Sequence, residues 1–272
     1  MAVKYLAGDR LIGTTAERTA LTTALISGST GWDINAQQSI GSGFLNWFSQ
    51  SDDPNTNSRA IYDLGVGNEI DGDFVIRMKG LFDDESGGGV FYWWMGTTDN
   101  TMAISGETAI GFQGHDSKKI RTYATNSDQS YNTGGLSDAL STGNTYYIEL
   151  IRNGAVLTAK VFTGSDFSTG QVGSTSSYTL ASRYQMGTDY RYIGFKGNGA
   201  GRDWTAGGSY QAWDFDDIVI YDGQTSATTA TYTFNFSDIP AVYPNLTNGT
   251  IFEESDTGKH YMFDGTSTWN EM

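Results

Sequence analysis

Cysteine is absent from this chain of 272 residues, and proline and histidine are scarce, with three and two copies. Without cysteine the protein has no disulfide, no thiolate zinc site and no cysteine nucleophile. The two histidines, His115 and His260, leave little scope for metal or acid–base chemistry built on imidazole. Long apolar runs are missing too, because the longest, residues 90–95, is far shorter than a bilayer span requires.

Basic side chains are few: 16 Lys and Arg face 31 Asp and Glu, which gives a formal net charge of −15. A protein that follows nucleic-acid phosphates needs a basic stripe, so this charge argues against nucleic acid as a partner. It argues equally against docking on anionic lipid, and with the short apolar runs it predicts no membrane insertion. The first residues form no apolar secretory core, which together with the missing cysteine predicts synthesis in a reducing cytoplasm.

Glycine, with 35 copies, and aromatic residues, at 14%, are abundant. Apolar and polar side chains alternate as in half-buried strands, most clearly at 74–82, where Arg77 and Lys79 fall on the polar face. Asn153-Gly154 joins two such runs, 145–152 and 155–162, and is a strong hairpin signal. Further strands are expected at 60–66, 89–97, 108–113, 118–125, 190–195 and 213–222. Many strands with almost no helix between them predict an all-β, two-sheet antiparallel sandwich.

The strand-rich region resembles the concanavalin A-like (laminin G-like) jelly rolls over some 200 residues. The similar segments are Phe74–Phe82, Ala109–Gln113, Tyr146–Gly154, Tyr192–Phe195 and Asp216–Asp222. The resemblance implies a curved sandwich. It also implies carbohydrate binding as in many members, glycan hydrolysis as in some, or a purely structural role as in others.

The two ends of the chain follow other patterns. Residues 1–30 hold a short helical pattern, with Thr14 as N-cap and Glu17 completing a capping box, and this predicts an N-terminal arm. Residues 237–272 predict a small C-terminal β-hairpin, which needs another surface to be stable. We therefore expect an N-terminal arm at 1–30, a jelly roll at 31–236 and an adaptor hairpin at 237–272.

Both ends carry a second resemblance, to modules of phage and archaeal-virus structural proteins. Gly249–Trp269 resembles a short module common at the ends of such proteins, and Gly8–Leu21 is similar to openings of marine virion proteins. In those modules the helix directly precedes the hairpin, whereas here some 220 residues separate them. The resemblance implies a jelly roll inserted into a split adaptor module, with both termini brought together. It implies an assembly role for five residues: Phe252, Tyr261, Phe263, Trp269 and Leu21.

Two kinds of ligand site are expected. Exposed rings stack on sugars, and Trp204 with Asp203 in the Gly-rich loop 197–209, together with Trp94, form the candidate carbohydrate site. Core or interface packing is the alternative for any of these tryptophans. Calcium takes carboxylate and carbonyl oxygens in loops, and the candidates for this cofactor are Asp83, Asp84 and Glu85 in one cluster and Asp214, Asp216 and Asp217 in another. The alternative is that these acids cap turns and keep the protein soluble.

No catalytic constellation stands out, so no enzyme activity is predicted. Glycan hydrolysis needs two carboxylates flanking the cleaved bond, and acids two residues apart, such as Asp214 and Asp216, lack a glucanase-like Glu-rich setting. The leading hypothesis is a non-enzymatic virion structural protein, a capsid decoration, spike or fibre-like subunit, whose partners are itself as a homo-oligomer and other virion proteins. The alternative is a lectin-like, calcium-dependent module for host glycans, and a glycoside hydrolase is the third hypothesis.

Overall fold

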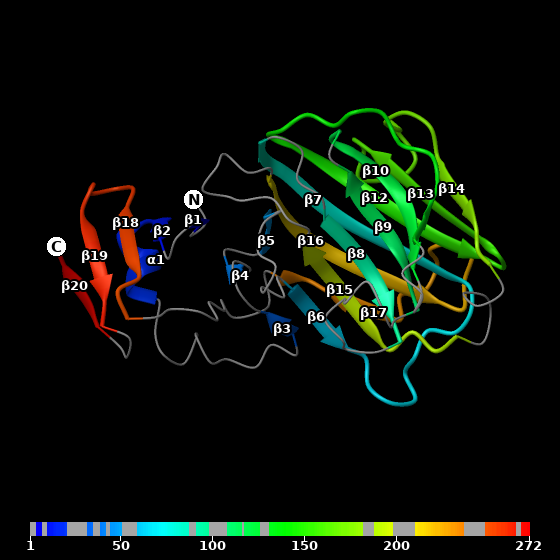
Figure 1. The fold of residues 1–272 in the computed structure, drawn as a ribbon, viewed down its shortest axis with the longest axis horizontal. Coiled ribbons are helices and arrows are strands. Elements are labelled where there is room, and N and C mark those ends of the chain that lie inside the picture. The colour runs from blue at the N-terminus through cyan, green and yellow to red at the C-terminus, as the bar shows by residue number, and fades with distance from the viewer. Residues whose placement is uncertain are drawn as a thin grey trace.

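The computed structural model describes most of the chain. The described residues are 4–6, 10–20, 32–34, 39–41, 44–50, 59–86, 91–97, 108–115, 117–125, 131–181, 188–197, 210–236, 248–264 and 268–272. They form a two-sheet antiparallel sandwich and, beside it, a small sheet built from both ends of the chain (Figure 1). No helix within the described part is long and apolar enough to cross a membrane.

The first layer of the sandwich is a seven-stranded sheet in the order β11-β10-β9-β8-β15-β6-β3. Its strands are β3 (Trp32–Ile34), β6 (Arg59–Asp63), β8 (Phe91–Gly96), β9 (Ala109–His115), β10 (Lys119–Thr125), β11 (Tyr131–Thr133) and β15 (Tyr192–Gly197). All of its pairings are antiparallel.

The second layer is an eight-stranded sheet. Its main path runs in the order β14-β13-β12-β7-β16-β5-β4, and β17 pairs with β16 beside that path. The strands are β4 (Ser39–Gly41), β5 (Phe44–Gln50), β7 (Phe74–Ser86), β12 (Asn144–Asn153), β13 (Val156–Phe162), β14 (Ser176–Thr179), β16 (Tyr210–Asp222) and β17 (Tyr232–Phe234). The hairpin predicted at Asn153-Gly154 joins β12 to β13, and Gly154 has the positive φ, 56°, that the turn demands.

Aromatic rings fill the space between the two layers. Phe195 of the seven-stranded sheet stacks on Phe215 of the eight-stranded sheet with ring centroids 4.3 Å apart, and Trp213 stacks on Phe82 at 4.6 Å. The predicted apolar face of 74–82 lies in this core, whereas Arg77 and Lys79 face outward. The high aromatic content is therefore used to fill the core, as the two-sheet prediction requires.

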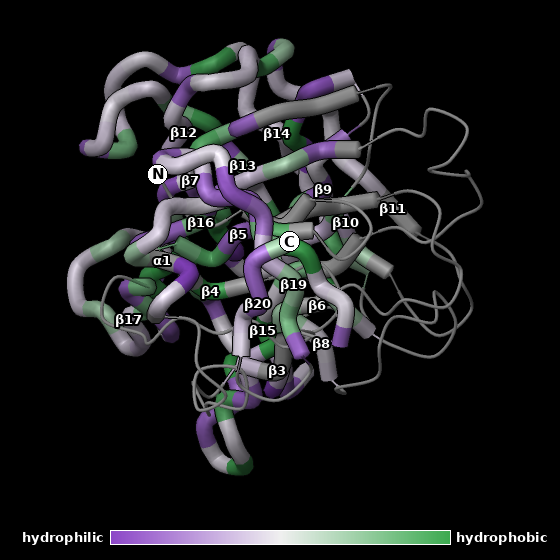
Figure 2. Tube along the Cα trace, turned by 90° about the vertical axis from the view of Figure 1, so that its left-hand side faces the viewer, coloured by the Kyte–Doolittle hydropathy of each residue, from purple (hydrophilic) through white to green (hydrophobic). Residues whose placement is uncertain are grey.

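The small sheet unites the two ends of the chain in the order β1-β2-β18-β19-β20. Its elements are β1 (Lys4–Leu6), β2 (Arg10–Gly13), α1 (Thr15–Ala20), β18 (Ile251–Glu254), β19 (His260–Phe263) and β20 (Trp269–Glu271). Strand β2 runs parallel to β18, with Leu11 opposite Phe252. Figure 2 views the molecule from the side on which this sheet lies.

The N-terminal helical arm of the sequence analysis needs correction. Residues 4–20 contribute two strands and a single six-residue helix to a sheet shared with the C-terminal hairpin, so they are not a separate arm. The expectation that the termini come together is confirmed by the pairing of β2 with β18. The predicted boundaries near residues 30 and 237 lie outside the described residues and stay predictions.

Candidate functional site

The outer face of the eight-stranded sheet carries polar side chains from its central strands. Arg77 and Lys79 extend from β7, while Tyr147 and Glu149 extend from the neighbouring strand β12. The register places Arg77 opposite Glu149 and Lys79 opposite Tyr147. This face is therefore a polar surface on a rigid sheet, the kind of setting in which side chains keep a fixed geometry.

A β-bulge shapes this face where β16 passes β7. Asp216 pairs with Lys79 and Val219 with Arg77, so β16 has one residue more than β7 over this stretch. Within the bulge Asp217 has a φ of +50°, a backbone angle that residues other than glycine rarely adopt. The bulge lets the side chain of Asp217 be exposed while its neighbours Asp216 and Ile218 are buried.

A tight loop after β13 folds over the same face. Phe167 has a φ of +55°, and its ring packs edge-on against Tyr147 at 5.7 Å and against Phe162 at 6.4 Å. The guanidinium carbon of Arg77 lies 4.6 Å from the centre of the Phe167 ring. Phe167 and Asp217 are two of the three non-glycine residues with positive φ in the described part of the chain.

Asp166 holds the loop in shape. Its carboxylate accepts hydrogen bonds from the backbone nitrogens of Ser168 and Thr169, both at 3.0 Å, and from both of their hydroxyls. These bonds, led by the one from the Thr169 backbone, hold the pKa of Asp166 far below its usual range. Asp166 therefore has a positioning role, and the residue it positions is Phe167.

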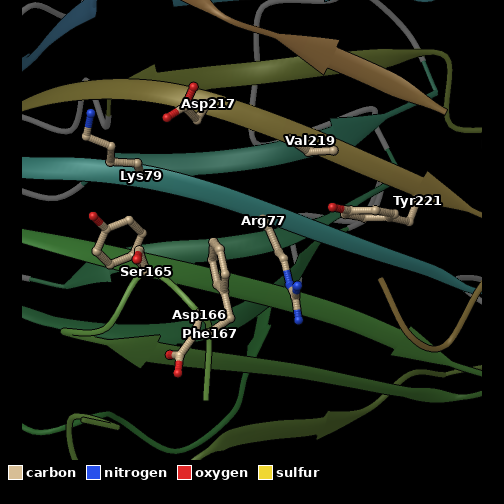
Figure 3. Close-up of a pocket in the computed structure, with 9 residues that line it drawn as sticks. Arg77, Lys79, Ser165, Asp166, Phe167, Asp217, Val219 and Tyr221 are labelled. Carbon is tan, nitrogen blue, oxygen red and sulfur yellow. The ribbon is translucent and has the colours of Figure 1, made fainter. Parts of the chain in front are cut away.

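Together the strands and the loop border an open hollow of about 390 Å³. It is lined by Arg77, Lys79, Tyr147, Ser165, Asp166, Phe167, Asp217, Val219 and Tyr221. Figure 3 shows Asp217, Val219 and Tyr221 following β16 along one side of the hollow, with the loop of Ser165, Asp166 and Phe167 facing them. The two strained residues, Phe167 and Asp217, thus lie on opposite sides of one cavity.

Two ion-pair groups fix the floor of the hollow. Arg77 donates from Nε and Nη2 to Oε2 of Glu149, both at 2.8 Å, and Lys160 Nζ lies 3.8 Å from Oε1 of the same carboxylate. Beside them Lys79 Nζ lies 3.6 Å from Oδ2 of Asp216, whose Oδ1 accepts a hydrogen bond from the Phe236 backbone nitrogen at 3.1 Å. Glu149 and Asp216 are both buried, so their charges are balanced within the sheet.

Other polar groups of the hollow stay available. Within the described part of the chain, no hydrogen bond occupies the carboxylate of Asp217 or the hydroxyls of Tyr147, Tyr221 and Ser165. Desolvation, together with the charge of the adjacent Asp216, raises the pKa of Asp217, and Lys79 offsets this in part. A surface acid with a raised pKa at a bulge is a frequent feature of binding and catalytic sites.

Of the three predicted carbohydrate-binding residues, the structure describes Trp94 alone. Trp204 and Asp203 fall outside the described residues, so their role stays a prediction. Trp94 is completely buried, against Ile61 and Ala109 on the outer side of the seven-stranded sheet, so it offers no ring face to a sugar. The expectation that Trp94 binds a sugar is therefore corrected. Trp93 lies in the main core on the inner face of β8, and the outer face, where Trp94 lies, is covered as well.

Only part of the two predicted calcium clusters is described. Of the first cluster only the side chain of Asp83 is described, and those of Asp84 and Glu85 are not. In the second cluster Asp216 is already engaged by Lys79 and the Phe236 backbone nitrogen, which argues against a cation there, and Asp214 has other partners too. Among the residues that the structure describes, no three His, Asp or Glu side chains could jointly hold a metal.

Four of the five predicted assembly residues build the interior of the small sheet. Phe252, Tyr261 and Phe263 are buried, and the ring of Trp269 lies 5.6 Å from that of Phe252 and 4.9 Å from that of Phe263. Leu21 lies outside the described residues. An assembly role for these residues remains a prediction, and the described four can act in it by keeping the small sheet folded.

No motif in the sequence predicted Phe167, Tyr147, Tyr221 or Ser165 as site residues. Strand alternation alone places Tyr147 with Arg77 on the outer face, so part of the signal was present. The segment Asp166-Phe-Ser-Thr169 is also a recognisable side-chain-capped turn, in which Asp accepts bonds from the two following polar residues. Nothing local indicates that this turn folds back over β12 and β7.

Comparison with known proteins gives similarity at the level of architecture. No protein-family model matches the chain, and no curated protein matches it. Among solved structures, the carbohydrate-binding module CBM66 from Bacillus subtilis is similar at 8% identity and a TM-score of 0.39, over 72% of this chain and 98% of that one. The CBM2 module of the evolved Dit of Lactobacillus casei BL23 phage J-1 is similar at 9% identity and a TM-score of 0.42, over 76% and 96%.

A third similar structure is the enzymatically active domain of tailspike protein 2 from bacteriophage CBA120, at 11% identity and a TM-score of 0.45. The match covers 78% of this chain but only 35% of the tailspike chain. At such identities and TM-scores these likenesses assign no ligand, activity or partner to this chain.

Proposed function

We propose that this protein is a non-catalytic carbohydrate-binding jelly roll that uses the hollow beneath Phe167. The observation that carries the proposal is the convergence of two strained residues, Phe167 and Asp217, on one cavity that also contains unoccupied hydroxyls. Backbone strain persists only where the surrounding structure enforces it, and it concentrates at functional sites. This proposal takes up the alternative hypothesis of a lectin-like module and gives it a candidate binding site.

The chemistry of the hollow suits a sugar. A pyranose presents an apolar face of C–H groups and a rim of hydroxyls, so it is bound by aromatic rings with hydrogen-bonding groups beside them. Phe167, Tyr147 and Tyr221 supply rings at the hollow, and Asp217 and Ser165 supply groups that accept or donate hydrogen bonds. The floor is a rigid sheet, which keeps the entropic cost of binding low.

Binding is favoured over hydrolysis by the state of the acids on this face. Glycoside hydrolysis requires two carboxyl groups flanking the cleaved bond, one of them able to donate a proton. Glu149 and Asp216 are buried and paired with Arg77 and Lys79, which leaves Asp217 as the exposed carboxyl with no hydrogen bond among the acids described at the hollow. One such acid can orient a sugar but does not complete the pair.

A glycan array followed by affinity measurements tests the proposal. We expect saturable binding to a subset of glycans, weakened about tenfold by Phe167→Ala and several-fold by Tyr221→Phe, which removes a single hydroxyl. Tyr178→Phe is the matched control, because Tyr178 lies on β14 and does not line the hollow. Wild-type protein that binds no glycan, or binding indifferent to Phe167→Ala, contradicts the proposed site.

A second function is supported by the small sheet. The two ends of one chain form a compact unit beside the sandwich, and they are joined by the β2–β18 pairing and by the ion pair of Arg18 with Glu254. We propose that this unit attaches the protein to other virion proteins or to copies of itself, as a capsid decoration, spike or fibre-like subunit. In this proposal the protein is made in the host cytoplasm and carries the sugar-binding jelly roll on the virion surface.

Removing residues 237–272 tests the attachment role. The truncated chain is expected to keep the sandwich and its glycan binding while it no longer assembles or enters virions. Circular dichroism reports on the sandwich, and solution mass and virion incorporation report on attachment. Normal assembly of the truncated chain rules out an attachment role for this unit.

A further inference from the structure

We propose that the hollow selects glycans without net charge and rejects those whose sugars carry carboxylates, such as uronic acids. The inference rests on the proposed carbohydrate-binding function and specifies its ligand class. It follows from how the charges around the hollow are already used, because a cation that a buried protein carboxylate balances attracts a ligand carboxylate less strongly than an unpaired cation does.

Arg77 is committed to Glu149. Both of its hydrogen bonds, from Nε and Nη2, end on the same carboxylate oxygen at 2.8 Å. The Glu149 side chain is 6% exposed, so drawing Arg77 away from it leaves a buried charge that only Lys160, 3.8 Å away, still balances. Leaving a buried ion short of its partner is strongly unfavourable, and a sugar carboxylate that competes for Arg77 must overcome that cost.

Lys79 is engaged more loosely, by Asp216 at 3.6 Å. Any carboxylate that approaches Lys79 also approaches Asp217, which lines the same hollow, is exposed and carries its own negative charge. Desolvation and the charge of the neighbouring Asp216 already raise the pKa of Asp217. A ligand carboxylate adds one more negative charge beside these two acids.

The charges near the hollow give no positive excess. Its lining contains two cations, Arg77 and Lys79, and two carboxylates, Asp166 and Asp217. The residues behind the lining add the cation Lys160 and the carboxylates Glu149 and Asp216. The chain as a whole has a formal net charge of −15, so a polyanionic glycan is also repelled at long range when the salt concentration is low.

A neutral sugar meets none of these costs. Its hydroxyls can donate to the Asp217 carboxylate, which has two acceptor oxygens, and can exchange hydrogen bonds with Ser165 and the tyrosine hydroxyls. Hydrogen bonds to a charged acceptor are the strong ones, so Asp217 is the residue expected to orient the ring. The same carboxylate thus attracts hydroxyls and repels acids, which makes it the specificity-determining residue.

Polyuronates and their carboxyl-reduced counterparts provide the test, because reduction replaces each carboxylate by a neutral hydroxymethyl group and leaves the linkages unchanged. For any backbone that is bound, we expect the reduced polymer to bind at least about tenfold more tightly than the polyuronate at the same ionic strength. Asp217→Asn should shrink this ratio. Asp189→Asn is the matched control, since it changes the net charge equally at an exposed position that does not line the hollow.

A second variant tests the commitment of Arg77. Glu149→Gln keeps the size of the side chain but removes its charge, so Arg77 becomes available to an acidic sugar and binding of polyuronate is expected to rise several-fold. The thermal unfolding curve of this variant shows whether it is folded. If it is not, the substitution Asp217→Asn, at an exposed position, tests the charge selection instead.

The outcomes separate the two proposals. Equal or tighter binding of polyuronates than of their reduced forms overturns the charge selection while carbohydrate binding itself stands. A preference for neutral polymers that Asp217→Asn leaves unchanged overturns the role given to Asp217. Absence of binding to every glycan of a broad array and to both forms of every polymer overturns the proposed function, and the charge selection with it.

Discussion

The carboxylate of Asp256, in the turn between β18 and β19, accepts a hydrogen bond at 3.0 Å from the backbone nitrogen of Thr15, 241 positions earlier. Thr15 opens helix α1, whose first backbone donors have no partner within the helix. An acid at that position satisfies one donor and complements the helix dipole. The C-terminal hairpin therefore caps a helix of the N-terminus, and neither end of the small sheet is complete without the other.

The first prediction concerns the pH dependence of the small sheet. Burial alone raises the pKa of Glu254, but hydrogen bonds from Thr257, Arg18 and Thr15, with the charge of Arg18, lower it overall. A carboxyl with a lowered folded pKa stabilises the fold above its unfolded pKa of about 4.3, and this contribution is lost as the pH falls further. Denaturant unfolding between pH 7 and pH 3 should show this loss, and Glu254→Gln should flatten it. An unchanged pH profile in that variant contradicts the assignment.

The second prediction concerns Gly111, in the centre of the seven-stranded sheet. A Cβ atom there would overlap the backbone carbonyl of Trp93 on the neighbouring strand, and a backbone cannot move aside as a flexible side chain can. Gly111→Ala should therefore lower the free energy of unfolding by roughly 1–3 kcal/mol. Gly135→Ala is the control, because nothing lies within 4 Å of a Cβ there, and a similar loss in both variants refutes the steric explanation.

The third prediction concerns Arg152, which is completely buried at the end of β12. Its Nε lies 3.4 Å from the Gly154 carbonyl oxygen, while Nη1 and Nη2 have no partner in the described part of the chain. Burial lowers the pKa of Arg152, although the charges of Tyr190, Asp73 and Asp71 oppose this.

A buried cation with unmet donors is costly, so Arg152→Met should leave the free energy of unfolding unchanged or raise it by up to about 4 kcal/mol. Arg152→Ala should lower it by roughly 2–5 kcal/mol, because it removes the stem as well and leaves a cavity. Chemical denaturation measures both changes. A large loss of stability in the Met variant would show that the guanidinium has an essential partner.

The sandwich was predictable because each strand has a recognisable pattern within its own residues. Alternation at 74–82 and the Asn153-Gly154 turn depend on neighbouring residues alone, and both appear in β7 and in the β12–β13 hairpin. The pair Trp93 and Trp94 shows the limit: alternation correctly separates them to two faces, but it cannot show that the outer face is covered as well.

The site was much less predictable. Arg77, Tyr147, Phe167 and Asp217 lie between 20 and 140 positions apart in the sequence, and only the fold brings them together. The bulge at Asp217 is a difference in residue number between two paired strands, so neither strand's sequence predicts it by itself. The cap on α1 has the same origin: the sequence places Thr14 and Glu17 near the helix start, whereas Asp256 reaches it through the fold.

The fourth prediction separates the positioning of Phe167 from its contact with a ligand. Asp166→Ala removes the acceptor of four hydrogen bonds in the loop that sets the strained φ of Phe167, but it leaves the ring itself intact. The loop then relaxes, so glycan affinity should fall as it does in Phe167→Ala, while the unfolding temperature of the sandwich changes little because the loop is exposed. Asp166→Asn, whose amide oxygen still accepts from the Ser168 and Thr169 backbone, should restore part of the affinity. Wild-type affinity in Asp166→Ala would mean that Phe167 needs no such support, whereas loss of affinity with no recovery in Asp166→Asn would instead assign the carboxylate a direct contact with the sugar.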